Sequence, residues 1–522
     1  MRLTIDTRQV LESLIEETGL VAAWKSLLAA RVQESNKTYS YILKSPEFCG
    51  VTPATYDLLK YLTVGEISIL YEYALAYNDK AKRKIDGQFF TPDDVSRFLA
   101  NHESKFSSST VWVDPCSGVG NLSYWMIRRQ KNPEKFLLKR IFLVDLDPLA
   151  LLTARVFFTL EFQKQEATLF NNLDTRFLVR DFLTANDLPK FDAAILNPPY
   201  VSGVFHTAFR TAQTKNMYAY FLERVATLCP AGYISITPQT FTNGSRFRSL
   251  RDVLLEYHKT IDVYCFDNVP DNIFSGIKFG SDNSNKANST RAGIIIARHT
   301  DKQRHRITPL LRWRSHERIQ LLASAEQFLT EVTFSADLFH KVSKELKSLY
   351  ETVRDFKQTL GDLVVSAPSP YELQVPTTPR YYISANKRPV RRTSYKTLYF
   401  ASAHDRDRVY VILNSSYMYW WWRVQDGGMT ISDRTLLGLP IPTLTNLVVA
   451  KQFVKKLEIS ERSSLVIKMN AGKPIENIKH PQDLINSITA FLFPKYANLL
   501  SNTHSNSHLS SKKVILQPQL IS

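Results

Sequence analysis

The segment "FDAAILNPPYVSG", residues 191–203, runs an apolar, strand-like stretch directly into Asn-Pro-Pro-Tyr. The two prolines remove two backbone donors and prevent a central strand from continuing. One interpretation is a strand end followed by a rigid turn. Another is a loop at the carboxyl edge of a sheet, which holds an amide, a carbonyl and an aromatic face towards a planar substrate. Deciding between them requires the other motifs.

A glycine-containing segment follows an earlier strand-like stretch. "VWVDPCSGVGNL", residues 111–122, places Asp114, Gly118 and Gly120 directly after apolar residues. The glycines allow a tight turn and the close approach of a ligand. The third glycine of the dinucleotide-binding fingerprint is missing, so this segment alone is also compatible with an ordinary turn.

Acidic residues end the next two strand-like stretches. "FLVDLDP" carries Asp145 and Asp147 before a proline, where an acid can accept hydrogen bonds from ribose hydroxyls or cap a helix. "VRDFL" carries Asp181 and Phe182 at the end of the following stretch.

The elements that must position these residues alternate between strand and helix patterns from about residue 110 to 300. That alternation predicts an α/β fold with a doubly wound, parallel, Rossmann-like sheet, in which ligands bind outside the carboxyl ends of the strands. Apolar residues at helical spacing predict a helical region over residues 1–84. The sheet domain is expected over 85–300, an α+β domain over 301–500 and a disordered tail over 501–522.

The composition narrows the classes of protein and partner. The 522 residues carry 66 Lys and Arg against 49 Asp and Glu, a net charge of +17 that favours nucleic acid as the partner. No apolar run is long enough for a membrane span, and the N-terminus does not resemble a signal peptide. The four scattered cysteines predict a reducing, cytoplasmic location and no metal site.

Seven motifs in this order make the chain resemble the gamma group of adenine-N6 DNA methyltransferases, over about residues 85–300. "GQFFTP" is similar to the motif that precedes the family's fold, and "DPCSGVGNL" to its Asp-Pro-Ala-Cys-Gly-Ser-Gly-Asn form. "VDLDPLAL" departs from the family by having Asp145 where Glu is usual. "RDF", the Asn-Pro-Pro-Tyr segment, the helix-strand-helix that follows it and "VPDNIFSGIKF" complete the series.

The resemblance implies S-adenosylmethionine as cofactor and N6 of a flipped adenine in duplex DNA as the methyl acceptor. Asn197 and the Pro198 carbonyl would accept the two N6 hydrogens, while Pro199 stiffens the loop. Tyr200 and Phe274 would form two walls around the extruded base. The implied cofactor-binding residues are Thr91, Asp114, Gly118, Gly120, Asp145, Asp181 and Phe182.

The region after residue 300 fits a target-recognition domain. "NKRPVRRTSYK", residues 386–396, contains five basic residues and no acid, which predicts contact with phosphates or, more simply, a solvated loop. The predicted contacts are Lys387, Arg388, Arg391, Arg392 and Lys396. Trp420 to Trp422 are expected in the core, and Arg312, Arg423, Gln425 and Arg434 are candidates for reading bases.

Several alternatives stay open. The Asn-Pro-Pro-Tyr loop is also used by methyltransferases that act on cytosine N4, RNA or protein glutamine. A DNA-binding protein with an inactive cofactor site is a further interpretation. A fused nuclease is not expected, because the only nuclease-like tripeptide downstream, Glu345-Leu346-Lys347, lies in an ordinary charged helix pattern. We expect a monomer on double-stranded DNA, with any cognate restriction endonuclease on a separate chain.

Overall fold

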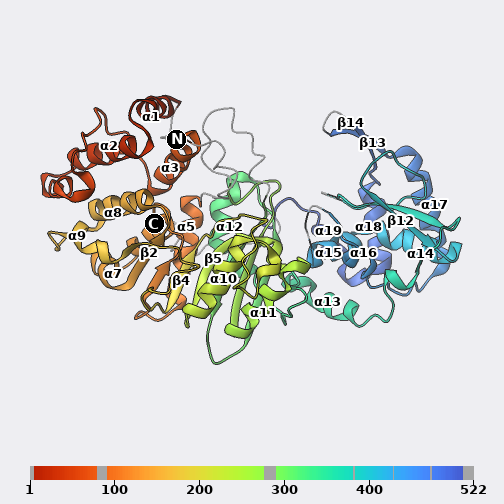
Figure 1. The fold of residues 1–522 in the computed structure, drawn as a ribbon. Helices are drawn as coiled ribbons and strands as arrows, with labels where there is room; N and C mark the ends of the chain where they lie inside the picture. The colour runs from red at the N-terminus through yellow and green to blue at the C-terminus, as the bar shows by residue number, and fades with distance from the viewer. Residues whose placement is uncertain are drawn as a thin grey trace.

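The computed structural model describes residues 5–78, 91–274, 290–379, 382–426, 428, 430–470 and 473–509. Its largest element is a nine-stranded sheet in the order β3-β2-β1-β4-β5-β7-β6-β8-β9 (Figure 1). The strands are β1 (Trp112–Asp114), β2 (Ile141–Asp145), β3 (Phe177–Val179), β4 (Ala193–Leu196), β5 (Gly232–Pro238), β6 (Thr260–Phe266), β7 (Ala292–Arg298), β8 (Arg304–Leu311) and β9 (Thr330–Glu331).

The alternation of strand side chains explains why helices cover both faces. In β2, Ile141 and Leu143 point into one apolar cluster, whereas Phe142 and Val144 point into the cluster on the opposite face. Strands buried on both faces need apolar residues at nearly every position, which is the pattern that the sequence shows. The first face is covered by α5 (Asp93–Asn101), α6 (Asn121–Arg128), α7 (Pro133–Arg140), α8 (Pro148–Phe162) and α12 (Arg318–Ser324), the second by α10 (Met217–Leu228) and α11 (Arg248–Tyr257).

The α/β fold with a doubly wound sheet is therefore confirmed, with two corrections. The sheet is not wholly parallel, because β7 is antiparallel to both of its neighbours, β5 and β6. The sheet also does not end at residue 300, because β8 pairs in parallel with β6 and β9 pairs with β8. Backbone pairing thus assigns 301–331 to the lobe that contains the nine-stranded sheet rather than to the next domain.

The first described part of the chain, residues 5–78, contains the helices α1 (Ile5–Thr18), α2 (Leu20–Gln33) and α3 (Val64–Asn78). Their apolar side chains share a cluster with the outer side of α8, and the Trp24 indole N–H donates to Thr153 Oγ1 of α8 at 2.9 Å. Figure 1 shows these helices, in red, lying against α8. The predicted helical character of this region agrees with the structure, and residues 79–84 lie outside the described part.

The C-terminal lobe has its own apolar core, which begins at Val342 and runs to Leu500. It combines a small antiparallel sheet with helices, as an α+β domain should. Trp420, Trp421 and Trp422 are at most 6% exposed, so the prediction that they are core residues is confirmed. Its main elements are α13 (Lys347–Arg354), β10 (Val364–Val365), β11 (Glu372–Pro376), β12 (Tyr395–Phe400), α14 (Ala403–Leu413), α15 (Ser416–Gln425), α16 (Asp433–Leu437), α17 (Leu447–Ser463), β13 (Leu465–Asn470), β14 (Lys473–Ile478), α18 (Gln482–Leu492) and α19 (Ala497–Asn502).

Residues 501–509, which the sequence placed in a disordered tail, pack against the sheet instead. The Arg312 backbone N–H donates to His508 Nδ1 at 2.9 Å, and the His508 N–H donates back to the Arg312 carbonyl at 3.0 Å. The ring of His504 stacks on Tyr419 with 4.2 Å between centroids. The polar composition predicted disorder here, but the His508 ring bonds to Arg312 and the His504 ring stacks on Tyr419, and these two partners belong to different lobes. Residues 510–522 lie outside the described part.

No helix in the described ranges is long and apolar enough to cross a membrane.

Candidate functional site

The carboxyl ends of four parallel strands bring the predicted residues to one edge of the sheet. Because β3, β2, β1 and β4 run in the same direction, the residues that end them or follow them share that edge. Asp114 ends β1, Asp145 ends β2, Asp181 comes two residues after β3, and Asn197 directly follows β4. The four side chains therefore lie together at the carboxyl edge of the sheet, as the sequence predicted, and their functional roles stay predictions.

The glycine loop after β1 is held by the acid of the neighbouring strand. The Gly118 N–H donates to Asp145 Oδ2 at 2.7 Å. Gly118 and Gly120 have φ angles of +52° and +83°, which other residues rarely adopt. A Cβ at Gly120 would lie 2.7 Å from Phe158 of α8, whereas a Cβ at Gly118 would meet no atom within 4 Å. Gly120 thus permits close packing, and Gly118 borders open space that a ligand can approach.

Asp114 is the most strongly perturbed acid at this edge. Its carboxyl is 1% exposed, and one oxygen accepts from Ser123 Oγ at 2.8 Å. The other oxygen has no hydrogen-bond partner among the described residues. Burial raises the pKa of Asp114 to about 7; the Ser123 hydrogen bond opposes this rise and the nearby charge of Asp145 adds to it. An oxygen in this state is suited to accept a proton donor from a ligand.

The two acids that follow β2 have separate roles. Asp147 caps α8, since its Oδ1 accepts from the N–H groups of Leu149 at 2.9 Å and Ala150 at 3.3 Å, and its Oδ2 accepts from the Tyr71 hydroxyl. The helix-cap interpretation therefore applies to Asp147. Asp145 is half-buried and accepts from Gly118 and from the Asp147 N–H. Its predicted contact with a ribose stays a prediction.

The side chains of Asp181 and Phe182 make more contacts within the protein than the sequence suggested. The Asp181 carboxylate accepts from the Leu183 N–H at 3.0 Å and from Thr184 Oγ1 at 2.9 Å, which shapes the turn after β3. The Phe182 ring is 2% exposed and stacks on Phe221 of α10, with 6.0 Å between centroids. In this arrangement Phe182 is a core residue. Contact of Phe182 with a cofactor ring would require one edge of it to become accessible.

Thr91, expected to bind the cofactor, contacts the Asn-Pro-Pro-Tyr loop itself. Its hydroxyl oxygen accepts from Asn197 Nδ2 at 2.9 Å, and its carbonyl accepts from Asn121 Nδ2 at 2.7 Å. Asn121 also donates to Ser96 Oγ. Because Nδ2 faces Thr91, the amide oxygen of Asn197 is aimed away from it. Sequence reasoning missed this link, since 106 residues separate the two side chains. Residues 87–90 of the preceding motif lie outside the described part.

Pro198 is buried, whereas Pro199 and Tyr200 are partly exposed. The Tyr200 hydroxyl donates to the Ile236 carbonyl of β5 at 3.2 Å. Tyr200 and Phe274 pack edge to face, with 6.0 Å between centroids and 65° between planes. Rings in direct contact leave no gap for a base between them, so Phe274, 5% exposed, supports Tyr200 in this arrangement. The prediction of two facing walls therefore requires Phe274 to move. Residues 275–279 of its motif lie outside the described part.

In the basic tract, residues 386–396, some side chains are held in ion pairs or hydrogen bonds and others are exposed. The Lys387 ammonium is paired with Asp407 at 2.6 Å and Glu458 at 2.7 Å, and that of Lys396 with Asp433 at 2.6 Å. The Arg392 guanidinium donates to Asn477 Oδ1 at 2.6 Å and Thr378 Oγ1 at 2.9 Å. Only Arg388 and Arg391, among the five predicted contacts, are exposed in the described structure. Contact with phosphate stays a prediction, and the exposed Arg388 and Arg391 are the best placed to make it.

Two arginines proposed as base readers are buried instead. Arg312 of the segment after β8 and Arg423 of α15 both donate to Asp267, which follows β6; the Arg312 Nε contact is 2.8 Å. Arg291 donates to the other carboxylate oxygen at 2.8 Å. Arg312 is 1% exposed and Arg423 7% exposed, so neither can reach a base in this arrangement. This hub joins the lobe of the nine-stranded sheet to the C-terminal lobe, so these two candidates for reading bases are buried in the described structure.

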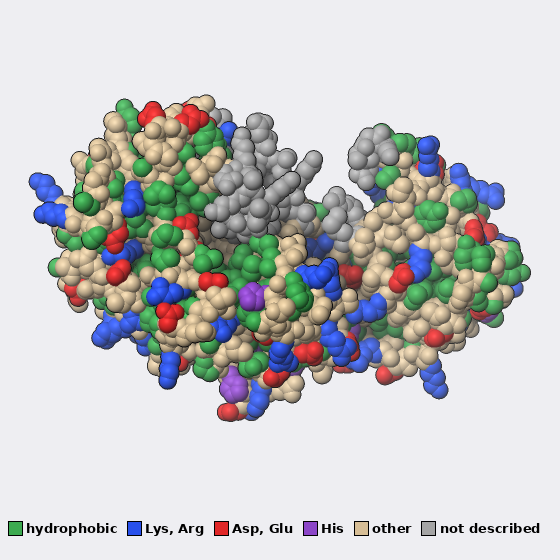
Figure 2. All heavy atoms as spheres, in the orientation of Figure 1, with side chains coloured by type: hydrophobic (Ala, Val, Ile, Leu, Met, Phe, Trp, Pro, Cys, Tyr) green, Lys and Arg blue, Asp and Glu red, His purple; other side chains and the backbone are tan. Residues whose placement is uncertain are grey.

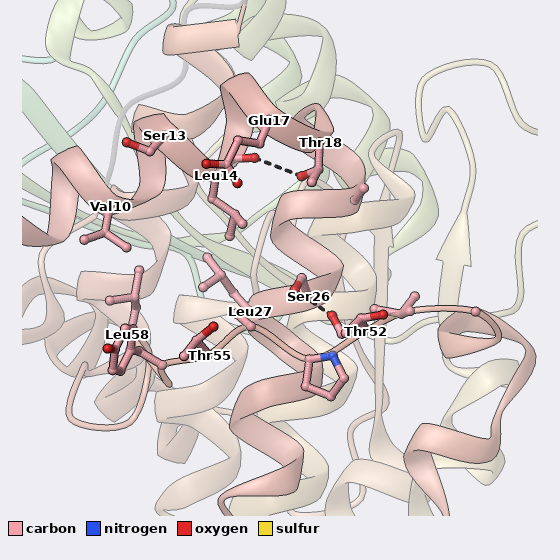
Figure 3. A pocket seen from close by; sticks show the side chains of 16 residues that line it. Val10, Ser13, Leu14, Glu17, Thr18, Ser26, Leu27, Thr52, Thr55 and Leu58 are labelled. Carbon is pink, nitrogen blue, oxygen red and sulfur yellow. Dashed lines mark hydrogen bonds between the residues drawn. The ribbon is translucent and has the colours of Figure 1, made fainter.

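A cavity of about 590 Å³ lies elsewhere, between α1, α2 and residues 50–58 (Figure 3). Val10, Leu14, Leu27 and Leu58 give it apolar walls, and the Ser26 hydroxyl donates to the Thr52 carbonyl at its rim. None of the predicted site residues lines it. The cavity is therefore separate from the carboxyl edge of the sheet, where the predicted site residues lie.

Comparison with known proteins points to the same part of the sheet. A model of the Eco57I restriction-modification methylase family matches residues 139–274, from β2 to Phe274. The Type II methyltransferase M.BsuBI of Bacillus subtilis is 27% identical over 217 residues, which cover 37% of this chain and 42% of that protein. The Type II methyltransferase M.PstI of Providencia stuartii is 24% identical over 219 residues, 38% of this chain and 42% of that protein.

The chain therefore matches about two fifths of the length of these curated relatives. Among solved structures, the DrdV–DNA complex aligns with 85% of this chain and 49% of its own chain, at 13% identity and a TM-score of 0.44, too low to carry an argument. The matched segment contains the Asp145, Asp181 and Asn197 strand ends together with Tyr200 and Phe274. Over this segment the chain is similar to methyltransferases of restriction-modification systems.

Proposed function

We propose that this protein is a site-specific DNA methyltransferase that transfers a methyl group from S-adenosylmethionine to N6 of an adenine flipped out of duplex DNA. The observation that carries the proposal is the Asn197 amide, held by Thr91 at the carboxyl end of β4 and followed by Pro198-Pro199-Tyr200. The matched methylase family and the two Type II methyltransferases support the reaction class.

The residues at the sheet edge fit the proposed cofactor. Asp114 has one carboxylate oxygen without a described partner, and Gly118 borders open space beside it. These two would meet the amino-acid end, Asp145 the ribose and Asp181 the adenine, and Phe182 would reach the adenine only if an edge of its buried ring became accessible. When bound, the cofactor supplies a methyl group on a positively charged sulfur.

The loop supplies acceptors for an exocyclic amine. The lone pair of adenine N6 is delocalised into the ring, so the amine is a poor nucleophile. Asn197 Oδ1 and the Pro198 carbonyl would each accept one N6 hydrogen, which concentrates the lone pair on nitrogen. The prolines donate nothing and keep both acceptors fixed, so little reorganisation is needed. The amine becomes acidic as it gains the methyl group, and its proton can leave to water.

Tyr200 would stack on the extruded base, with Phe274 packed behind it. Stacking of a base on an aromatic ring contributes about 1–3 kcal/mol, which offsets part of the lost stacking in the duplex. The exposed Arg388 and Arg391 would contact phosphates. We further propose that one chain acts on one site and that a cognate endonuclease, in a restriction-modification pair, is a separate protein.

The test is analysis of the product. Purified protein is incubated with duplex DNA and isotopically labelled S-adenosylmethionine, the DNA is digested to nucleosides, and the labelled base is identified by mass spectrometry. We expect N6-methyladenine, and label in N4-methylcytosine would contradict the adenine assignment while leaving the reaction class intact. Transfer to tRNA or release-factor protein in place of DNA would overturn the substrate class.

The matched control is Asn197→Ala. It should bind cofactor and DNA but transfer methyl groups at least about 10²-fold more slowly in a single turnover, by analogy with the loss of one preorganised hydrogen bond. A near-normal rate would mean that the loop is structural.

A further inference from the structure

A two-stranded ribbon of the C-terminal lobe presents apolar side chains to solvent. β13 and β14 pair with each other and with no other described strand. Ile467 is 61% exposed and Met469 68% exposed, and they lie two residues apart on the same face of β13. Figure 1 shows the ribbon at the top of the C-terminal lobe. Two large apolar side chains held together on a projecting ribbon suggest a surface that is covered in use.

The ribbon is tied to the basic tract. The Arg391 N–H donates to Glu476 Oε2 at 2.8 Å, and the Glu476 N–H donates back to the Arg391 carbonyl at 3.0 Å. Glu476 lies directly across the ribbon from Ile467. The half-buried Arg392 adds its guanidinium contact with Asn477 of β14. The backbone of the exposed Arg391 is therefore fixed beside Glu476 of β14, the strand next to the one that carries Ile467 and Met469.

This combination selects the kind of partner. The ribbon carries the exposed cation Lys468 on the face opposite the apolar pair, and the exposed Arg391 is hydrogen-bonded to β14. A second copy of this chain, itself at +17, would bring like charges together. A nucleic-acid duplex offers the complement, an anionic outside with the apolar methyl groups of thymine in its major groove. The major groove of B-DNA, about 12 Å wide, admits a two-stranded ribbon and displays thymine methyl groups.

The surface between the two lobes is hollowed on the side where the ribbon stands, and Lys and Arg side chains gather at the junction below the hollow (Figure 2). A duplex lying in this hollow would run beside the ribbon and extend towards the nine-stranded sheet.

We propose that the β13–β14 ribbon enters the major groove of the DNA beside the target base, with Ile467 and Met469 against thymine methyl groups and Arg391 at a flanking phosphate. This proposal rests on the proposed function for the presence of DNA, and it assigns sequence reading to a segment that no motif marked. Its apolar contacts carry sequence information, whereas its phosphate contact fixes the register.

The experiment compares two double variants of one lobe. Ile467→Ser with Met469→Ser removes the apolar pair, and Val448→Ser with Ile459→Ser removes two side chains of α17 that are 69% and 68% exposed. Affinity for the duplex that wild type binds most tightly, selected from random duplexes by repeated rounds of binding, is measured by fluorescence anisotropy across a salt series. We expect the ribbon variant to bind at least tenfold more weakly with an unchanged salt slope, because every cation that faces a phosphate is still present. The α17 variant should bind within twofold of wild type.

The position of the ribbon on the DNA is tested by replacing each thymine of the selected duplex with uracil, which lacks the methyl group. One or two replacements should weaken wild type and leave the ribbon variant unaffected, since the variant no longer touches the thymine methyl group. Wild-type affinity in the ribbon variant, or uracil effects equal in both proteins, would overturn the proposal. So would a wild-type dimer that the ribbon variant abolishes, because the partner would then be a second copy. If wild type binds DNA through the ribbon without methylating it, the proposed function fails and the ribbon proposal stands.

Discussion

At the scale of single residues, one hydrogen bond determines how the loop presents its amide. Asn197 can offer its oxygen or its NH2 group to a substrate, and a rotation of the amide by 180° exchanges them. The bond from Nδ2 to Thr91 Oγ1 selects the orientation that aims the oxygen away from α5. Thr91 is thus a positioning residue, in addition to its predicted contact with the cofactor.

We expect Thr91→Val to slow single-turnover methyl transfer by up to about tenfold, the range of one net hydrogen bond of roughly 0.5–1.5 kcal/mol. Valine has nearly the shape of threonine but accepts no hydrogen bond. Thr91→Ser keeps the hydroxyl and should restore the rate. If Thr91 acted only on the cofactor, Thr91→Val would raise the cofactor Kd and leave the rate at saturation unchanged.

The acid Asp114 gives a prediction for stability against pH. Its pKa in the folded protein is about 7, above the ordinary value of 3.8, so the folded state retains a proton that the unfolded state releases. Stability from this group is therefore full below about pH 4 and declines as the pH rises to about 7. Between pH 5 and pH 8 wild type should lose roughly 2–3 kcal/mol that Asp114→Asn does not lose. Urea unfolding of both proteins at the two pH values measures this difference, and parallel curves would contradict it.

At the scale of elements, the segment 386–396 joins several elements of the C-terminal lobe to one another, in addition to its proposed role as a binding loop. Lys387 joins it to α14 through Asp407 and to α17 through Glu458, while Arg392 joins it to β14. Basic composition alone could not distinguish held from exposed cations, because the acids that hold them lie far along the chain.

Arg388→Ala with Arg391→Ala should lower the slope of log affinity against log salt by about 0.9 for each phosphate that is no longer neutralised, on specific and random DNA alike. Lys387→Ala should leave that slope unchanged and lower stability instead, since its ammonium is held in ion pairs. Binding titrations at several salt concentrations, with urea unfolding of each variant, measure both quantities. The reverse pattern would show that Lys387 leaves its acids to contact DNA.

At the scale of the whole molecule, one buried carboxylate connects the two lobes. Burial raises the pKa of Asp267, but attraction by Arg423, Arg291 and Arg312 outweighs it and holds the pKa well below its usual 3.8. The stability that this group contributes is therefore complete above about pH 4 and is lost only as the pH falls further. Arg312 also donates to the Tyr419 hydroxyl of α15 at 2.7 Å, which extends the connection into the C-terminal core.

Asp267→Asn should lower the free energy of unfolding by about 3–5 kcal/mol, because it leaves buried guanidinium groups without their carboxylate. The loss should be similar at pH 5 and pH 8, and proteases should cut near residues 332–343, between the two lobes, faster than in wild type. Arg318→Ala, which removes an ion pair with Asp94 within the lobe of the nine-stranded sheet, is the control for loss of one charge. Equal proteolysis of both variants at this junction would mean that the hub does not hold the lobes together.

Local patterns in the amino-acid sequence were enough to predict most of the alternation of strands and helices and the edge of the sheet at which the candidate site residues lie. Period-two and period-3.6 patterns are local, and parallel strands must end at a common edge, so Asp114, Asp145, Asp181 and Asn197 could be placed without any contact being known. The burial of Trp420 to Trp422 was predictable for the same reason, since three consecutive indoles are rarely left in water.

Which polar groups meet could not be predicted in this way, because it depends on how distant segments pack. The Thr91–Asn197 bond, the Asp267 hub and the ion pairs of Lys387 each join residues at least 20 apart along the chain. The antiparallel insertion of β7 and the continuation of the sheet into β8 are set by backbone pairing, which side-chain patterns do not encode. Whether an arginine meets DNA or a carboxylate depends on how the lobes pack, because Arg312 and Arg391 have the same chemistry but occupy a buried junction and an exposed loop.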